Sequence, residues 1–153
     1  MAAPRVYDKA KYHYGGNYPK DLPKEQAFVH TGMFLGWLID HVLCSEDFYR
    51  ESHASVEAFK RREKTGTQIY VEWDGALVED MLSEDGNAFA RHYFDFQTGR
   101  YLKDYEVLVG AGLPSLYHVQ DTWDNYQAIA RRIDQRYAQW MRQRRKRWWE
   151  FWV

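Results

Sequence analysis

One nearly continuous apolar segment, between residues 28 and 43, limits most strongly what this chain can fold into. Its apolar residues recur at spacings of 4, 3, 4 and 4, the period of an α-helix. A second apolar stripe lies beside the first, so this helix must be buried on most of its sides. The run is shorter than the roughly 20 residues of a membrane-spanning helix. We therefore expect a central helix over about 24–43, with Phe28, Gly32, Leu35, Ile39 and Leu43 on its main stripe.

Helical periodicity extends over most of the chain. Apolar residues from Trp123 to Trp140 recur at 3, 3, 4, 4 and 3, which predicts a helix from 122 to at least 142 with Asp121 as its N-cap. Further helices are expected over 45–63, 87–95 and 101–109. Residues 67–82 fit short helices or strands, and Asp74-Gly75 is a turn signal, so a hairpin there stays open.

These elements predict a mainly α fold. At 153 residues the chain suits one domain, so we expect a single compact helical domain over 1–143 with a long C-terminal helix and at most one small β-hairpin. Within it, 1–22 is expected to be an ordered N-terminal arm, because its four tyrosines are too many for a free tail. Residues 144–153 form a basic-aromatic tail. Gly32 and Gly36, four residues apart on one helix face, indicate close approach by a neighbouring backbone.

The motifs of common enzyme classes are missing from the sequence. It holds no GxSxG, no phosphate-binding loop, no dinucleotide-binding GxGxxG and no HExxH. Cys44 is the sole cysteine, which gives no support for a cysteine-based zinc site. We therefore expect no catalytic residues, no cofactor and no metal site. A histidine on an apolar helix, such as His30, is expected to be a hydrogen-bonded core residue.

The near-zero net charge of −1 conceals an asymmetry. Residues 131–147 hold eight basic side chains and one acid, whereas 1–130 hold 13 basic and 20 acidic residues, a net of −7. Either a charged partner or internal pairing of the basic helix with the acidic body would explain this. The segment 72–85 has six acids and no base, which indicates a solvated face or a docking patch for a basic partner. These acids are Glu72, Asp74, Glu79, Asp80, Glu84 and Asp85.

The tail combines basic and aromatic side chains. Such a segment suits an anionic membrane interface or stacking on single-stranded nucleic acid, of which nucleic acid is the less expected. It also suits packing on its own body or on a second copy. The residues concerned are Arg144, Arg145, Lys146, Arg147, Trp148, Trp149, Phe151 and Trp152.

The N-terminal arm offers one further candidate site. Asp8, His13 and the Gly15-Gly16 turn have the side chains and backbone to line a site, and His30 is the residue that would join them. An enzyme built on Asp8, His13 and His30 is therefore an alternative hypothesis, although no reaction is assigned to it.

Several segments together resemble a bacterial family of small uncharacterised proteins, a domain of unknown function. They are Tyr7-Asp8-Lys9-Ala10, His13-Tyr14-Gly15-Gly16, Tyr18-Pro19, Asp21-Leu22-Pro23, His30 to Trp37, Asp74-Gly75, Gly86 to Ala90, Tyr93-Phe94 and Tyr101 to Tyr105. Small proteins of this kind often look like immunity proteins of polymorphic toxin systems. By that analogy we expect a non-enzymatic protein that binds and neutralises a cognate toxin, with the acidic patch as docking surface.

The expected location is the cytoplasm, because neither a signal peptide nor a spanning segment is visible in the sequence. The alternative to a toxin-binding protein is a membrane-peripheral accessory protein held by the tail. In both cases the partner would be a protein or a membrane surface, and nucleic acid is not expected.

Overall fold

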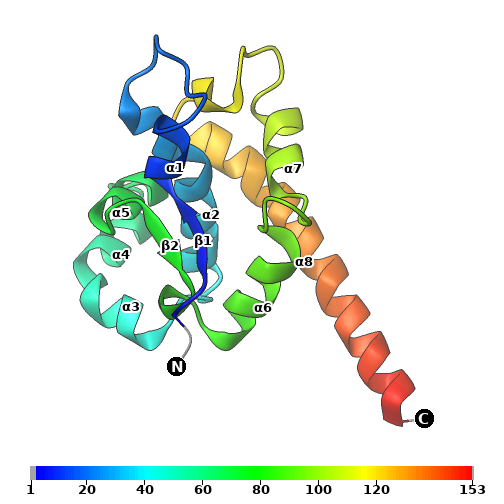
Figure 1. The fold of residues 1–153 in the computed structure, drawn as a ribbon. Coiled ribbons are helices and arrows are strands. Elements are labelled where there is room, and N and C mark those ends of the chain that lie inside the picture. The colour runs from blue at the N-terminus through cyan, green and yellow to red at the C-terminus, as the bar shows by residue number, and fades with distance from the viewer. Residues whose placement is uncertain (1–2, 153) are drawn as a thin grey trace.

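The computed structural model describes residues 3–152 and places α2 (Val29–Asp40) at the centre of the molecule (Figure 1). Every residue of α2 from Val29 to Ile39 is buried, as the apolar segment predicted. A 3₁₀ helix (Lys24–Phe28) precedes α2, and the helix ends at Asp40 instead of Leu43. Val42 adopts a left-handed φ of 55°, which turns the chain away from the helix axis.

The predicted close approach at the α2 glycines is confirmed, and the neighbour is α5 (Gly66–Glu72). A Cβ added at Gly32 would lie 2.4 Å from the Cα of Thr67, and one added at Gly66 would lie 2.4 Å from the carbonyl oxygen of Gly32. At Gly36 the nearest atoms to an added Cβ would be in the rings of Phe59 and Tyr126, at 3.2 Å. The backbones of α2 and α5 therefore touch at Gly32.

The predicted helix over 45–63 is two helices, α3 (Glu46–Glu51) and α4 (His53–Lys60). Ser45 caps α3 by accepting a hydrogen bond from the Phe48 amide, as its residue type predicts. Ser52 breaks the helix, and its hydroxyl accepts a hydrogen bond of 2.8 Å from the Trp73 indole. The other two predicted helices are present with shifted ends, as α6 (Glu84–Tyr93) and α7 (Tyr101–Leu108).

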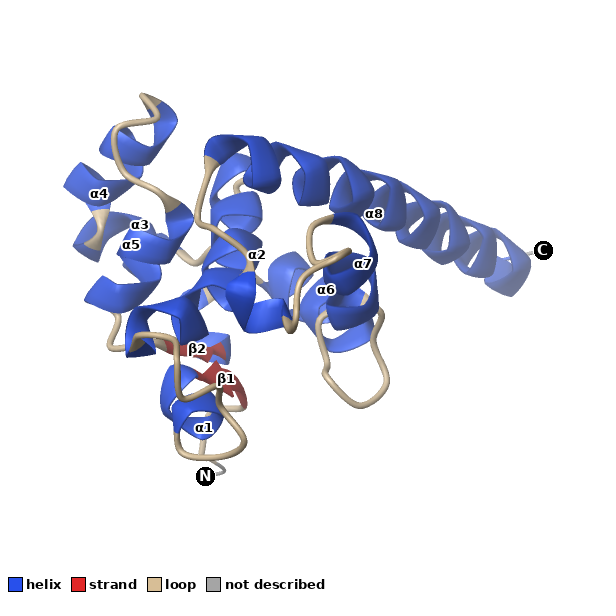
Figure 2. Cartoon of the chain, turned by 90° about the horizontal axis from the view of Figure 1, so that it is seen from above, coloured by secondary structure: helices blue, strands red, loops and turns tan. Residues whose placement is uncertain are grey.

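The sheet joins two segments that are far apart in the sequence. β1 (Val6–Lys9) pairs antiparallel with β2 (Ala76–Val78), and α1 (Ala10–Tyr14) follows β1 directly. The Asp74-Gly75 turn therefore joins a helix to a strand, and no hairpin forms around it. The N-terminal arm is ordered, as expected, but it consists of a strand and a helix packed over α2 (Figures 1 and 2).

The last helix, α8 (Trp123–Trp152), is longer than predicted and runs through positions 143 and 144 without a break. The predicted tail is therefore the final part of this helix, which projects beyond the body (Figure 2). The hydroxyl of Thr122 accepts from the Asn125 amide in the first turn, so the prediction of Asp121 as cap was wrong. Asp121 instead accepts hydrogen bonds from the hydroxyls of Thr65 and Thr67.

A buried carboxylate fastens α7 to α8. Asp104 accepts two hydrogen bonds of 2.9 Å from Arg136, one of 3.4 Å from Arg132 and one of 2.7 Å from the Tyr93 hydroxyl. Burial alone would raise the pKa of Asp104, but the hydrogen bonds from Arg136 and Tyr93 and the charges of both arginines hold it below its ordinary value. Part of the basic stretch is thus paired internally.

We predict that Gly32→Ala destabilises the fold by about 3 kcal/mol, because the new methyl group overlaps the backbone of Thr67. The matched substitution Gly36→Ala has ring atoms at 3.2 Å as its nearest contacts, so it overlaps less, and it removes a helix-interior glycine, which gains up to about 1 kcal/mol. Urea unfolding should therefore show a large loss of stability at position 32 and a change of about 1 kcal/mol or less at position 36. Equal losses at both positions would contradict this packing.

We predict that Asp104→Asn costs about 3 kcal/mol at pH 7, since it leaves Arg136 without its ionised partner. The pKa of Asp104 is lower in the folded than in the unfolded chain. Its contribution is therefore full above the unfolded value of about 3.9 and is lost as the pH falls through the folded value. The stability difference between wild type and variant should narrow below about pH 4. A difference that stays constant from pH 7 to pH 3 would refute this role.

Candidate functional site

The strand β1 directs one carboxylate into the core. Two residues of β1 oppose one of β2 between Val6 and Asp8, so the strand is bulged at this point. Bulges re-aim side chains, and Asp8 is turned inward, with 2% of its surface exposed. α1 begins two residues later and carries His13 back over the same region.

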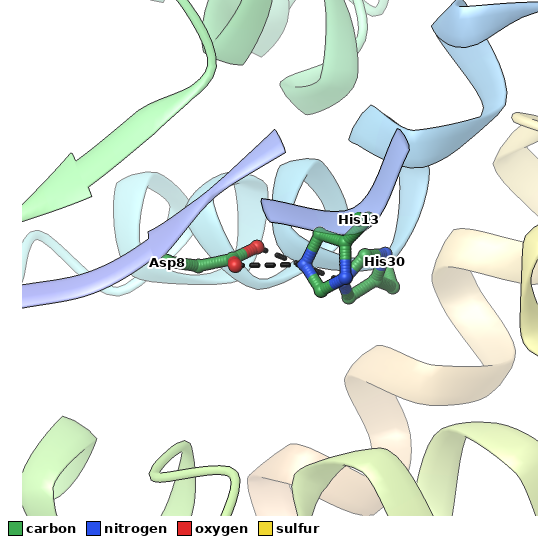
Figure 3. Close-up of side chains that lie close together, drawn as sticks. All are labelled: Asp8, His13 and His30. Atoms are coloured by element: carbon green, nitrogen blue, oxygen red, sulfur yellow. Dashed lines mark hydrogen bonds and ion pairs between the residues drawn. The ribbon is translucent and has the colours of Figure 1, made fainter. Parts of the chain in front are cut away.

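Asp8, His13 and His30 converge from three elements, β1, α1 and α2 (Figure 3). Nε2 of His13 lies 2.7 Å from Oδ1 of Asp8, and Nε2 of His30 lies 3.6 Å from Oδ2. One ligand-type atom from each residue lies within 4.8 Å of the other two. We call these three residues the Asp8 cluster. The structure thus brings together the three residues that the sequence offered as an alternative site.

Hydrogen bonds hold two members of the cluster in place. The Thr31 hydroxyl donates to Oδ2 of Asp8 at 2.6 Å. Nδ1 of His13 lies at hydrogen-bond distance, 2.8 Å, from the Tyr117 hydroxyl. Tyr117 is itself held by Gln26, whose amide donates to the carbonyl oxygens of Tyr117 and Val119 at 2.8 and 2.9 Å.

Burial and hydrogen bonding set the charges of the cluster. Burial would raise the pKa of Asp8, but the hydrogen bond from His13 and the nearby His30 lower it below its ordinary value. His30 is 1% exposed, and this burial lowers its pKa to about 4, although the charge of Asp8 acts in the opposite direction. At neutral pH the site therefore holds an ionised carboxylate beside a neutral imidazole.

His30 is a core residue, as predicted, but its ring lacks the predicted hydrogen bond to any described residue. Both of its ring nitrogens are buried without a hydrogen-bond partner among the described residues. The hydroxyls of Tyr70 and Tyr105 share this condition. Tyr105 lies beside His30, with 6.3 Å between ring centroids, and the Asp8 carboxylate contributes, after burial, to raising the pKa of Tyr70. Since an unsatisfied buried polar group costs about 1–3 kcal/mol, their concentration here needs an explanation.

The six acids of the segment 72–85 differ in exposure and in ion pairing. Five of its six acids are exposed and Glu79 is half-buried. Two are paired, because Glu72 binds Lys64 at 2.7 Å and Asp85 lies 3.6 Å from Arg144. No ion pair between described residues involves Asp74, Asp80 or Glu84, which leaves these three as the core of the candidate docking patch.

The basic-aromatic tail is exposed on the projecting part of α8. Trp148, Trp149 and Phe151 are 63%, 65% and 85% exposed, and Arg145, Lys146 and Arg147 are exposed as well. Arg144 contacts the body through Asp85 of α6, at 3.6 Å, and its guanidinium lies 4.5 Å from the ring of Trp140 on the same helix. The side chain of Trp152 lies outside the described side chains. Among the described residues, no helix combines the length and hydrophobicity needed to cross a bilayer.

Sequence reasoning missed the surroundings of the cluster. Thr31 adjoins His30 in the sequence, but nothing marked it as a partner of Asp8. Tyr117 lies 104 residues after His13, and Tyr70 and Tyr105 stand in other helices. Residues so far apart in the sequence form no recognisable motif, so only the fold could identify these tyrosines as neighbours of the cluster.

The fold and the Asp8 cluster define a small, mainly helical domain with a buried aspartate and two histidines at its centre. The chain belongs to the family described as domain of unknown function DUF7832, whose model matches residues 6–119. This agrees with the resemblance to an uncharacterised family. The matched residues include the whole Asp8 cluster and Tyr117, while α8 lies beyond them. No curated protein and no solved structure is found to match the chain.

Proposed function

We propose that this domain binds a divalent first-row transition-metal ion through Asp8, His13 and His30. The observation that carries the proposal is the buried cluster itself, in which neither ring nitrogen of His30 has a hydrogen-bond partner in the part of the chain that the structure describes. A metal ion ligated by one of these nitrogens would supply a partner that the protein does not. The absence of known motifs led us to expect no metal site. The Asp8 cluster nevertheless brings three ligand-type side chains together.

The donor set suits such an ion. Two imidazoles and one carboxylate are ligands that Zn²⁺, Fe²⁺ and related ions accept, whereas Ca²⁺ and Mg²⁺ prefer oxygen alone. In a tetrahedral site with bonds of about 2.0 Å, neighbouring donor atoms lie about 3.3 Å apart. The separations of 2.7 Å and 3.6 Å from the Asp8 oxygens to the two histidines lie on either side of this value. All three donor atoms lie within 4.8 Å of one another, so side-chain movement would have to complete the ligation.

The surroundings resemble those that orient metal ligands in general. A ligating histidine usually donates its other ring N–H to an oxygen, and a ligating carboxylate is itself hydrogen-bonded. With Nε2 of His13 on the metal, Nδ1 would carry the proton and would donate to Tyr117, and Thr31 donates to Asp8. The neutral state of His30 and the ionised state of Asp8 are the states that ligation requires.

The ligand number bears on what the ion would do. Closed structural zinc sites have four protein ligands, whereas catalytic sites have three and keep a position for water or substrate. The Asp8 cluster supplies three. This supports a metal that meets a small molecule, although no reaction is assigned, and the expectation of a non-enzymatic protein stays a prediction.

We predict that the purified chain takes up one Zn²⁺ per molecule, measured by elemental analysis after gel filtration. Zn²⁺ at about 100 times its dissociation constant should stabilise the fold by about 2.7 kcal/mol and raise the melting temperature by about 5–10 °C. Asp8→Asn and His13→Gln should each remove the shift, because each removes a ligand. His53→Gln is the control, since His53 is exposed on α4.

His13 is the most informative position, because its side chain is 14% exposed and its replacement disturbs the core least. A folded His13→Gln chain that retains the full metal-induced shift would contradict the proposed ligand set. So would a wild-type chain that binds no Zn²⁺, Fe²⁺ or Co²⁺.

A toxin-neutralising role is the second candidate, and the exposed acids of the docking patch support it. Asp80 and Glu84 lie near the junction of β2 and α6, where a basic partner would meet them without first breaking an ion pair. The patch is therefore suited to fast, salt-sensitive association with a basic protein.

We predict that the product of the adjacent gene co-purifies with this protein, and that Asp80→Lys with Glu84→Lys weakens the complex at least tenfold through charge repulsion. Glu106→Lys, a charge reversal on the exposed face of α7, should leave affinity within twofold. The measurement is a co-purification followed by titration calorimetry. Absence of a stoichiometric complex, or equal effects of the two charge changes, would count against a toxin-neutralising role.

A further inference from the structure

A second feature, which shares no residue with the Asp8 cluster, is a cavity of about 330 Å³ between α6, the turn before α7, and α8. Its walls include His92 from α6, Arg100 before α7, and Arg136, Gln139, Trp140 and Gln143 from α8. No aspartate or glutamate lines it. Helices α6, α7 and α8 lie side by side here (Figures 1 and 2).

The cavity is positively charged. Asp104 binds Nε and Nη2 of Arg136, which fixes the guanidinium and leaves Nη1 available. Arg132 also pairs with Asp104, so this acid is balanced by two arginines. Arg100 is exposed and forms no ion pair with a described residue. The arginines around the cavity therefore exceed the acids.

The helical repeat of α8 adds a further arginine. Arg136, Gln139, Gln143 and Arg147 are spaced by 3, 4 and 4, so they lie on one face of the helix. Burial, and then the charge of Arg147, lower the pKa of His92 on the opposite wall. Arg145 belongs to the opposite face of α8.

We propose that this cavity binds the phosphate group of a small phosphorylated molecule. Two arginines with free N–H groups, two glutamine amides and an imidazole all offer hydrogen-bond donors. Arginine forks match phosphate in geometry as well as in charge. Trp140, whose ring stacks with that of His92 at 6.1 Å, provides an aromatic wall for the organic part. The volume is at the lower end of ligand sites, so the ligand is a small one.

Titration calorimetry with inorganic pyrophosphate and with glycerol 3-phosphate tests the proposal. Wild type should bind at least one of them, and Arg100→Gln should weaken that binding at least tenfold. Because Arg100 is exposed, this variant should keep the wild-type melting temperature. Arg145→Gln removes the same charge from the opposite face of α8 and should change affinity less than twofold. His13→Gln should bind as wild type does, which separates this cavity from the proposed metal site.

Vesicles of phosphatidylcholine with one quarter phosphatidylglycerol distinguish a lipid headgroup from a soluble ligand. Vesicle binding that Arg100→Gln weakens would assign the cavity to a headgroup phosphate, and binding of the soluble probes alone would assign it to a free phosphate ester. Equal losses of soluble-probe affinity in Arg100→Gln and Arg145→Gln would overturn the proposal in favour of general charge attraction. Failure of every probe to bind in an Arg100-dependent manner would also overturn it.

Discussion

The carboxylate of Asp8 is ionised and buried, and a buried charge is tolerated only where hydrogen bonds or opposite charges compensate it. Its partners come from two other elements, Thr31 of α2 and His13 of α1. The buried charge of Asp8 therefore attaches the N-terminal arm to the central helix through the hydrogen bond from Thr31. One residue beyond Thr31, Gly32 brings α5 into backbone contact with α2. The candidate site thus adjoins the backbone contact between α2 and α5.

A rigid frame of this kind suits ligand binding. The side chains of the Asp8 cluster are positioned by a bulged strand, a short helix and the central helix, while Tyr117 is fastened through Gln26. Within this frame the ring nitrogens of His30 have no hydrogen bond from a described residue, and Nε2 lies 3.6 Å from Asp8. A metal ion would use this pre-organised set of donors with little reorganisation.

Local patterns predicted most of the helices, because helical hydrogen bonds and side-chain stripes involve neighbours in the sequence. The 3–4 spacing of apolar residues identified α2 and α8, and paired glycines identified the tight crossing. Pairings over long distances were not predictable. β2 has β1 as its partner about 70 residues earlier, and Ser52 breaks a helix through a bond to Trp73. Asp8, His13 and His30 were named as a possible group, but their separations and the lack of partners for His30 required the fold.

The basic side chains of the C-terminal stretch fall into two groups, one paired within the molecule and one exposed. Arg132 and Arg136 neutralise Asp104, and Arg144 approaches Asp85, so part of the basic stretch is paired within the molecule. Arg145 and Lys146 point outward on the projecting end of α8, next to exposed Trp149. The membrane and nucleic-acid hypotheses for this tail concern that exposed part, and they stay predictions.

The most direct test of the central claim is X-ray absorption spectroscopy of the Zn²⁺-loaded chain at the zinc edge. The Asp8 cluster predicts a first shell of nitrogen and oxygen at about 2.0–2.1 Å, with the outer-shell scattering of two imidazoles. His13→Gln should bind Zn²⁺ too weakly to give this spectrum. A sulfur ligand at about 2.3 Å, or a spectrum without imidazole scattering, would contradict the assignment of Asp8, His13 and His30 as the metal site.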